Sequence, residues 1–500
     1  MKQLPLPQLP PEDAYICDKV LRSKRYDDIY FSDENGLAET RHVFIHGTDL
    51  KEKLAIQEHL IIAETGFGTG LNFLAVVAEV LLLESKTKID YVSVEGSPLS
   101  KEKVAAALRP FHELKHIYDQ LLEQWPRRWL GVHHMSFLNG QISLHLHYGQ
   151  AEHVLPTFDF YADIWFLDGF SPAKNPEMWS NKIIKQIARL SALNSRLATF
   201  TVAASVRSSL ADAGFACTKV AGFGRKRDML TASYERGIPS REISRPLTVL
   251  VIGGGIAGCA LAGGLKALGI EVIILDAAAQ QGAGASGNPA GIVVPFLTVG
   301  DMIGSRLSIS CLADTRAFLE EHNLIISNGV ISLDYDKRKS SRQKKIAEQG
   351  FPSDLAIYKD ANELSARCGL NVEAGGLLFE TGAVIQPQKL CSHLSLGVER
   401  IYNAEFTDLS LFMFTFPLRS LPVDLTLTNI SLFNSSLLTS KLISLSIIFF
   451  FPSFSLGPTM ISFFPASIFI TYNASLSETF IPFLWPIVKL IIPLCTPITF

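Results

Sequence analysis

Two glycine-rich segments contain the residues whose types and spacing most clearly suit chemistry. The first, ETGFGTG, covers residues 64–70 and follows the apolar run LIIA. Glycines in such a loop let the chain turn tightly and bring backbone N–H groups close to a ligand. Its E-x-G-x-G-x-G spacing differs from that of NAD and FAD loops, and from the P-loop, which needs a lysine. It predicts a nucleotide-type cofactor site, with the candidate contacts Glu64, Gly66, Phe67, Gly68, Gly70 and Asn72.

This spacing resembles motif I of class I S-adenosylmethionine (SAM) methyltransferases. The downstream segment YVSVEG ends its apolar run at Glu95. An acid at that place in a doubly wound sheet can accept the two ribose hydroxyls of a nucleotide. Glu95 is therefore a further candidate cofactor contact, and the alternative is a purely structural glycine turn.

A third marked segment is ADIWFLDGFSPAKNPEMWS, residues 162–180. IWFL predicts a buried strand with Asp168 at its C-terminal end, where open α/β sheets bind their ligands. A carboxylate there suits a transferase acting on an amine, because the amine must be neutral to attack a methyl group and the carboxylate can orient it and manage its proton. Asp168 is the candidate catalytic residue; the alternative is that it only caps the next helix.

The second glycine-rich segment, VLVIGGGIAG, lies in mid-chain at residues 249–258. It places Gly253, Gly255 and Gly258 in a G-x-G-x-x-G pattern after a predicted strand and before a predicted helix, and Asp276 ends the next strand. In such a unit the helix N-terminus holds a pyrophosphate and the acid accepts the adenosine ribose. The pattern predicts a dinucleotide site without deciding between NAD and FAD.

These segments lie in two predicted α/β domains. Residues 1–236 alternate short apolar runs with longer helical stretches, which predicts a parallel sheet with helices on both faces. Residues 237–247 are polar with two prolines and are predicted to form a linker, and a second Rossmann-like domain is predicted over residues 248–400.

Residues 401–500 differ in composition from the rest of the chain. They contain seven charged residues, one glycine and 15 of the 32 phenylalanines. Prolines and serines interrupt each apolar run before the ~20 residues that a membrane span needs. We interpret this segment as an aberrant tail from a frameshift or misjoined reading frame, with a hydrophobic appendage as the alternative, and we expect no stable membrane association.

The bulk composition narrows the class of protein. A net charge of −3 gives no general attraction for nucleic acid, so such binding would need a local patch. The candidate is Arg225, Lys226 and Arg227, with a solvated surface as the alternative. Seven scattered cysteines without a C-x-x-C pair predict a reducing, cytoplasmic compartment. The histidines of residues 133–153 lack a metal-ligand spacing, so we expect an exposed hairpin and no metal.

Several long motifs together resemble one family. YDDIYFSDENGLAETRHVF, ETGFGTGLNFL, WFLDGFSPAKNPEMW, LATFT and GFGRKRDML follow in this order. They are similar to the bifunctional tRNA wobble-uridine modification enzymes of the MnmC family, and the similarity covers residues 20 to about 390. The segment GAGASGNPAGIVVP resembles the FAD-contacting segment of glycine-oxidase-like flavoenzymes, with Ser286, Gly287 and Asn288 as its matching positions.

The resemblance implies SAM and FAD as cofactors and the anticodon loop of tRNA as the partner, for a protein expected to be a monomer. It implies two steps in 5-methylaminomethyl-2-thiouridine synthesis. FAD-dependent oxidation removes the carboxymethyl group of the modified uridine, and SAM-dependent methylation then acts on the aminomethyl group. Because the end of the flavin domain is missing from the pattern, a methyltransferase with an inactive oxidoreductase half is the alternative. A membrane-tethered or tRNA-binding remnant without activity is a further one.

Overall fold

The computed structural model describes residues 9–17, 20–31, 35–224, 227–236, 248–300 and 303–404, and the backbone of four short strands beyond them. The chain forms two compact units. The first comprises Met1–Glu242, Leu297–Asp314 and Asp336–Ile357, and the second comprises Ile243–Phe296, Thr315–Tyr335 and Tyr358–Phe500. The predicted linker lies outside the described residues, and the predicted domain limits stay predictions.

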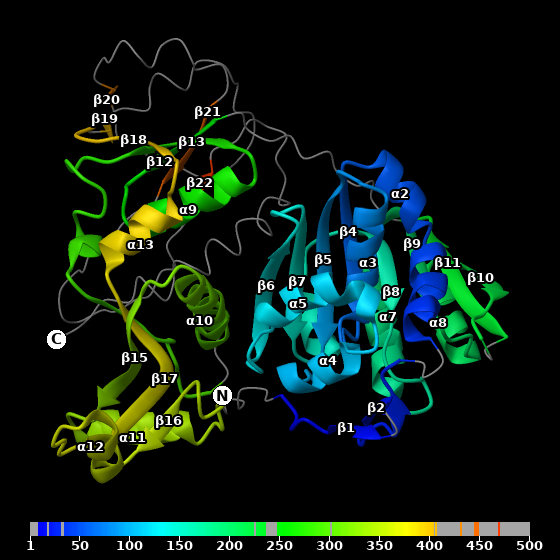
Figure 1. The fold of residues 1–500 in the computed structure, drawn as a ribbon, viewed down its shortest axis with the longest axis horizontal. Coiled ribbons are helices and arrows are strands. Elements are labelled where there is room, and N and C mark those ends of the chain that lie inside the picture. The colour runs from blue at the N-terminus through cyan, green and yellow to red at the C-terminus, as the bar shows by residue number, and fades with distance from the viewer. Residues whose placement is uncertain are drawn as a thin grey trace, which may run out of the picture. The chain divides into compact units, whose positions relative to one another are not determined.

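The first unit is built on an eight-stranded sheet in the order β10-β11-β9-β8-β4-β5-β7-β6 (Figure 1). Its strands are β4 (His59–Thr65), β5 (Lys88–Glu95), β6 (Gly131–Phe137), β7 (Ile142–Tyr148), β8 (Ala162–Leu167), β9 (Ser191–Thr199), β10 (Phe215–Ala221) and β11 (Asp228–Tyr234). The five strands from β9 to β7 in this order are parallel, as predicted. The prediction of a fully parallel sheet is wrong at both edges. There, β11 and β6 run antiparallel because short turns join β10 to β11 and β6 to β7.

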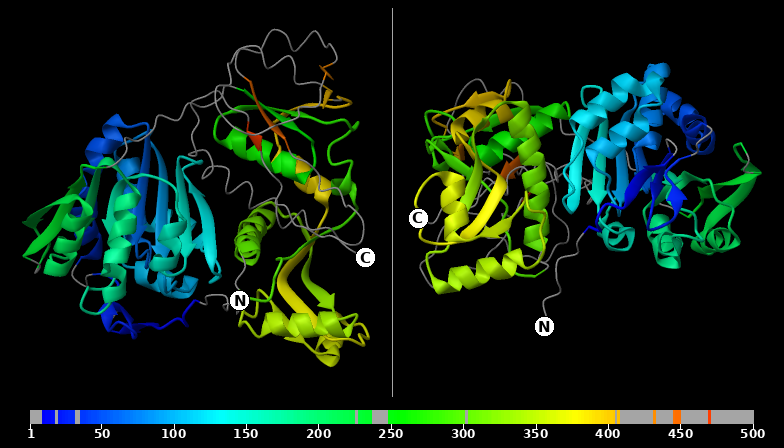
Figure 2. Two further views of the ribbon diagram at one scale, coloured as in Figure 1. Left: turned by 180° about the vertical axis from the view of Figure 1, so that it is seen from behind. Right: turned by 60° about the horizontal axis from the view of Figure 1, so that its bottom comes forward.

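Helices cover both faces of this sheet, and each face has its own core. One core contains side chains of α3 (Leu71–Leu82), α4 (Lys101–Leu108) and α5 (Lys115–Glu123). The other contains side chains of α6 (Ala151–Val154), α7 (Asn181–Arg189) and α8 (Ala204–Ala213), on the face seen from behind in Figure 2. Since every residue of β8 is buried between the two layers, this strand reads as a continuous apolar run.

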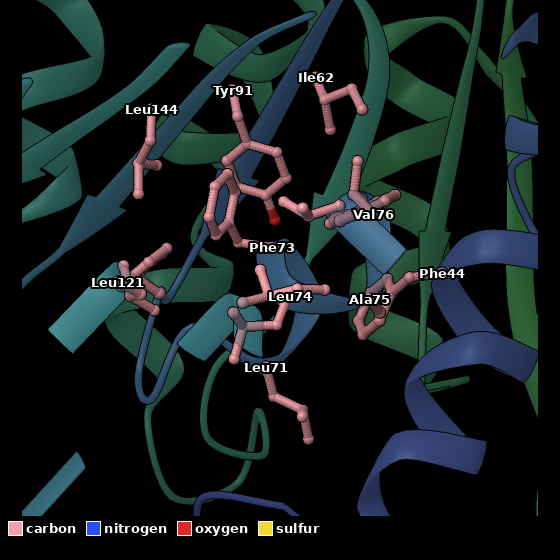
Figure 3. Close-up of a cluster of buried hydrophobic side chains, with 14 of the residues drawn as sticks. Phe44, Ile62, Leu71, Phe73, Leu74, Ala75, Val76, Tyr91, Leu121 and Leu144 are labelled. Atoms are coloured by element: carbon pink, nitrogen blue, oxygen red, sulfur yellow. The ribbon is translucent and has the colours of Figure 1, made fainter. Parts of the chain in front are cut away.

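Helix α3 presents apolar side chains to the sheet along most of its length. Figure 3 shows Phe73 beside Tyr91 of β5, and their ring centroids are 5.2 Å apart. Leu74, Ala75 and Val76 are fully buried in the same cluster. This packing fixes the N-terminus of α3 beside the end of β4, where the first glycine loop lies.

A segment before β4 folds against the loops of the first unit. It contains the small antiparallel sheet β1 (Ala14–Cys17), β2 (Val20–Ser23) and β3 (Asp28–Ile29), followed by α1 (Gly36–Thr40), the π-helical η1 (Arg41–His46) and α2 (Leu50–Ile56). Asp28 accepts a hydrogen bond from the backbone N–H of Ser171 at 3.1 Å, and Lys174 donates to the carbonyl of Asp27. These bonds hold the segment across the loop that follows β8.

The second unit contains the other glycine-rich loop, between β12 (Thr248–Ile252) and α9 (Ile256–Ala267). β12 lies in a sheet of order β18-β13-β12-β21-β22, with β13 (Glu271–Leu275), β18 (Glu399–Ile401), β21 (Leu445–Phe449) and β22 (Phe469–Ile470). A further sheet contains β14 (Gly291–Val293), β15 (Ile325–Leu333), β16 (Ile357–Lys359) and β17 (Gly376–Ile385). Helices α12 (Ala361–Cys368) and α13 (Pro387–Leu394) also belong to the second unit, whereas α11 (Lys337–Ala347) belongs to the first and α10 (Ile303–Glu321) is divided between the two.

The predicted aberrant tail, residues 401–500, falls almost entirely outside the described residues and stays a prediction. Two-residue strands β19 (Phe406–Thr407) and β20 (Ser431–Leu432) pair within it. Within the ranges that the structure describes, no helix has the length and apolar character to cross a membrane.

Candidate functional site

The first glycine loop adopts the conformation that its glycines predict. Gly66, Gly68 and Gly70 have φ angles of +81°, +55° and +80°. A Cβ at Gly66 would lie 3.0 Å from the carbonyl oxygen of Asp168, so this position needs glycine for space as well as for conformation. Gly70 leads into α3 without a side-chain cap, so the first amides of the helix are available to a ligand.

Glu95 ends β5 directly beside this loop. Its Oε2 accepts the Gly68 N–H at 2.8 Å and its Oε1 accepts the Ser97 N–H at 2.7 Å. Burial raises the pKa of Glu95, and these backbone hydrogen bonds partly oppose the rise. The acid and the glycines therefore meet at one point, as expected for the ribose end of a nucleotide site.

Asp168 lies at the C-terminal end of β8, on the other side of β4 from Glu95. Its Oδ1 accepts the Gly169 N–H at 2.8 Å, and its Oδ2 accepts Asn72 Nδ2 at 2.7 Å. The carbonyl oxygen of Asp168 accepts the Thr65 hydroxyl at 3.1 Å. Both carboxylate oxygens are thus oriented by fixed donors, and the residue does not act as a simple helix cap.

Asn72 joins two carboxyl groups through one amide. Its Nδ2 donates to Glu64 Oε1 at 2.9 Å as well as to Asp168, and its Oδ1 accepts the Thr40 hydroxyl at 3.0 Å. Ser93 donates to the other oxygen of Glu64 at 2.7 Å. Burial raises the pKa of Glu64 to about 8, and the bonds from Ser93 and Asn72 limit that rise. Burial therefore favours the neutral form of Glu64, which shares the Asn72 amide with Asp168.

A cavity of about 390 Å³ connects these groups. Gly66, Phe67, Gly68, Asn72, Glu95 and Asp168 line it, whereas Glu64 and Gly70 do not. The predicted contacts therefore fall into two sets. Six of the predicted residues form the wall, and Glu64 lies behind it with 1% of its surface exposed, in contact with Asn72.

The sequence analysis did not identify the aromatic wall of the cavity. Phe170 stacks on Tyr26 with ring centroids 4.7 Å apart and meets Tyr30 edge-on at 5.1 Å. All three rings line the cavity. Burial raises the pKa of both tyrosines, so they remain neutral phenols. Phe170 follows Asp168 by two residues, and Tyr26 and Tyr30 lie in the motif that begins YDDIYF, but no local spacing indicated that the three rings meet.

The predicted basic patch is described only in part. Arg225 and Lys226 lie outside the described residues, and Arg227 is exposed. The carbonyl of Arg227 accepts the Gly222 N–H at 3.0 Å in the turn between β10 and β11. Phe223 and Gly224 of the same turn line the cavity. Arg227 therefore comes shortly after two cavity-lining residues in the sequence.

The second glycine loop has the close packing that its motif requires. A Cβ at Gly258 would lie 1.8 Å from the carbonyl oxygen of Gly253, which itself has a φ of +101°. Asp276 accepts the N–H groups of Gly254 at 2.5 Å and Ala278 at 2.8 Å. The acid at the end of β13 thus holds the loop that precedes α9.

The predicted flavin-contacting segment approaches this loop through one residue. Ser286 Oγ accepts the Ile256 N–H at 3.1 Å, at the first residue of α9, and lies 3.3 Å from where a Cβ on Gly255 would be. Gly287 and Asn288 are exposed. The structure therefore brings Gly253, Gly255, Gly258, Asp276 and Ser286 together, while Gly287 and Asn288 lie at the surface.

His133, His134, His145 and His147 occupy the predicted hairpin, β6 and β7, where the expected exposure is wrong, whereas His153 lies in α6 and is exposed. His133 is 3% exposed, and His145 bonds His134 at 2.8 Å and Asp90 at 3.0 Å. Burial alone would raise the pKa of Asp90, yet hydrogen bonds from His145 and His59 hold it well below its usual range. The hairpin is drawn into the sheet because β7 pairs with β5. In the part of the chain that the structure describes, no cluster of His, Cys, Asp or Glu is arranged to hold a metal.

Two family models match the chain. The model for S-adenosyl-L-methionine-dependent methyltransferases matches residues 112–235, and the model for FAD dependent oxidoreductases matches residues 248–411. The two matches follow the order of the two glycine loops. They name SAM and FAD as the cofactors of the respective families.

Curated relatives are similar across both parts. A tRNA 5-methylaminomethyl-2-thiouridine biosynthesis bifunctional protein MnmC from Ectopseudomonas mendocina is 39% identical over 75% of this chain and 59% of its own length. The protein of the same name from Marinobacter nauticus is 37% identical over 78% of this chain and 63% of its own length. The chain thus spans about three fifths of the relatives that it matches.

Solved structures are more distant. MNMC2 from Aquifex aeolicus is 24% identical with a TM-score of 0.38, over 46% of this chain and 73% of its own. A glycine oxidase from Bacillus cereus is 18% identical with a TM-score of 0.26, over 33% of this chain and 49% of its own.

Proposed function

Since the chain is a relative of the MnmC proteins over its methyltransferase part and the first part of its flavin domain, we propose that it is a tRNA-modifying enzyme. Its proposed role is the last two steps of 5-methylaminomethyl-2-thiouridine synthesis at the wobble position. The second unit removes the carboxymethyl group of the modified uridine with FAD. The first unit then methylates the aminomethyl group with SAM.

One observation carries the methyltransferase proposal. Gly66 and Gly68 of the loop, the acid Glu95 and the carboxylate Asp168 line a single cavity of about 390 Å³. Glu95 and Gly68 form the end suited to a ribose, and Asp168 lies across β4 from them. Cofactor-holding groups and a candidate catalytic group therefore share one space, which is what transfer between two bound substrates requires.

SAM supplies an electrophilic methyl group when it is bound. In the transfer, the uridine amine nitrogen forms a bond to the methyl carbon as the carbon–sulfur bond breaks. The nitrogen then carries an excess proton, and the Asp168 carboxylate is the group oriented to accept it. Burial favours the neutral form of Glu64, the other carboxyl group bonded to the Asn72 amide.

The aromatic wall suits a base taken out of a single-stranded loop. Phe170, Tyr26 and Tyr30 offer ring faces and edges at the cavity, and base–aromatic stacking needs no duplex to be opened in an anticodon loop. We therefore assign the anticodon loop of tRNA as the substrate segment. Arg225, Lys226 and Arg227 follow Phe223 and Gly224 of the wall in sequence and are proposed to contact its phosphates.

The residues of the second unit fit a dinucleotide. The close approach of Gly258 to Gly253 leaves no room for a Cβ, and the N-cap of α9 has no side-chain bond. Gly253, Gly255 and Gly258 would hold the pyrophosphate and Asp276 the adenosine ribose. FAD supplies a two-electron oxidation when bound, and Ser286 is placed to orient the loop beside the helix N-terminus. The enzyme is proposed to be a cytoplasmic monomer.

The full chain tests the proposal directly. Purified protein is incubated with labelled SAM and tRNA carrying either the aminomethyl or the carboxymethylaminomethyl uridine, and the nucleosides are analysed by mass spectrometry. We expect methyl transfer to the aminomethyl nucleoside, lost in Asp168→Asn, and a flavin absorbance with conversion of the carboxymethyl nucleoside. Methyl transfer without flavin or oxidation would reduce the function to a methyltransferase, and no transfer to either tRNA would refute the proposal.

A further inference from the structure

Helix α11 concentrates positive charge on a chain whose net charge is −3. Its 11 residues, KRKSSRQKKIA, include six lysines and arginines and no acid. Its apolar contribution to the core is small, because only Gln343 and Ile346 are buried. The position of the helix in the fold is labelled in Figure 1.

Five of these six cations are exposed, and Lys344 is the fifth beside the four considered next. Lys337, Arg338, Arg342 and Lys345 are exposed, and within the described ranges none of them takes part in a salt bridge. Arg338, Arg342 and Lys345 follow one another by four and three residues and so share a face. They span about 10 Å of helix axis, a spacing that suits neighbouring phosphates of one strand.

Helix stability does not explain this charge pattern. Cations in the first turn oppose the helix dipole, and like charges four residues apart, as in Arg338 and Arg342, repel. Asp336 caps the helix by accepting the Lys339 N–H at 2.7 Å, and this cap offsets only part of the unfavourable dipole interaction and charge repulsion. By contrast, the cations at α12 are paired, since Lys359 contacts Glu363 and Arg367 contacts Glu380. Lys337, Arg338, Arg342 and Lys345 thus carry charge outside any described salt bridge, although Arg342 donates to the carbonyl oxygen of Leu297 at 3.5 Å, and this charge indicates an external anionic partner.

We propose that the exposed face of α11, formed by Lys337, Arg338, Arg342 and Lys345, binds the phosphate backbone of tRNA. The naming of tRNA as the polyanion rests on the proposed function. An anionic membrane is the competing partner, but a membrane-surface helix needs a large apolar face with residues such as Trp, Phe or Leu, and α11 has none of these. Phosphate contacts of this kind add affinity without sequence information, and they complement the aromatic cavity that would select the base.

The test is the variant K337Q/R338Q/R342Q/K345Q in the full chain. Glutamine keeps the helix propensity and removes the charge. We expect the Kd for unfractionated tRNA to rise about 10- to 100-fold near 0.1 M salt, and the slope of log K against log salt to become shallower by about 3. KM for tRNA rises with Kd, while kcat at saturating tRNA and the Kd for SAM stay unchanged.

A matched control neutralises four exposed lysines elsewhere in the first unit, Lys86, Lys88, Lys185 and Lys219. Equal tRNA affinity and salt slope in the α11 variant and the wild type would overturn the inference. So would flotation of the wild type with phosphatidylserine vesicles that is lost in the α11 variant while tRNA affinity is unchanged. If tRNA binding depends on α11 but no tRNA is methylated, the proposed function fails and this inference stands.

Discussion

The two glycine loops have the same geometry, and within the described residues only the first has a second carboxylate beside it, that of Asp168. In both, the acid ending the next strand accepts an N–H from the middle of the loop: Glu95 from Gly68 at 2.8 Å, and Asp276 from Gly254 at 2.5 Å. In the first loop a third strand adds Asp168, and the following helix adds Asn72 to hold it. The second loop is flanked by Ile252, Ile256 and Cys259, which carry no such group.

In these folds, the residues that hold a nucleotide are separable from the residues that perform chemistry. Glycines and a strand-end acid are enough to cradle a dinucleotide whose own ring reacts. Methyl transfer needs in addition a protein group beside the second substrate, because the proton of the amine must be managed.

Replacing Asp168 in one variant and Asp276 in another should separate methyl transfer from FAD binding most strongly. Asp168→Asn is expected to lower methyl transfer about 10²- to 10⁴-fold, because the amide cannot accept a proton and its NH₂ would face the Asn72 donor. Asp276→Asn should leave methyl transfer unchanged and weaken FAD binding. Single-turnover transfer from labelled SAM measures the first effect and flavin absorbance the second. A methyltransferase unaffected by Asp168→Asn would remove the distinction between the loops.

The second loop is expected to tolerate a side chain at one glycine and not at another. Gly258→Ala places a Cβ 1.8 Å from a backbone oxygen and should destabilise the second unit by about 3 kcal/mol or more. Gly253→Ala has open space and only the cost of its positive φ, about 1–2 kcal/mol. Thermal unfolding followed by limited proteolysis compares the two variants. Equal losses would mean that the helix does not pack against the loop as closely as described.

Glu64 should make the first unit less stable as pH rises. Its pKa is raised to about 8 in the fold against about 4.5 unfolded, so its stabilising protonated form is complete below pH 4.5 and lost as pH rises to 8. Glu64→Gln mimics the neutral form. We expect similar stability of both proteins near pH 4.5 and an advantage of a few kcal/mol for the variant at pH 9. Unfolding midpoints across this range measure it, and parallel curves would show that Glu64 is ionised in the fold.

Asn72 has a smaller expected effect, as a positioning residue. Asn72→Ala leaves the Asp168 carboxylate in place but removes one of its two donors, and kcat should fall about tenfold. Because the charge-stabilising bond is lost, the acidic limb of the pH–rate profile should move to higher pH. Thr40→Val, which removes the hydrogen bond that the Thr40 hydroxyl donates to Asn72 Oδ1, serves as the milder control. A loss of SAM affinity with unchanged kcat would instead make Asn72 a cofactor contact.

Much of the site follows from local sequence. The glycine spacing predicted a tight turn, and Gly66, Gly68 and Gly70 make it with positive φ angles, which glycine adopts most readily. The apolar run IWFL predicted a buried strand ending at Asp168, and the structure places it there. The sheet edges and the buried histidines were mispredicted, because strand direction and hairpin burial depend on pairing partners that lie elsewhere in the chain.

The sequence alone determined the two glycine loops, the order of the two cofactor families and the identity of the acids at the strand ends. These depend on backbone conformation and on short-range spacing. Only the tertiary structure decided that Asn72 bridges Glu64 and Asp168, that Glu64 lies behind the cavity, and that Tyr26 and Phe170 form its wall. Those contacts join residues up to about 140 positions apart in the chain. Local sequence spacing does not indicate which of such distant residues meet in the folded sheet.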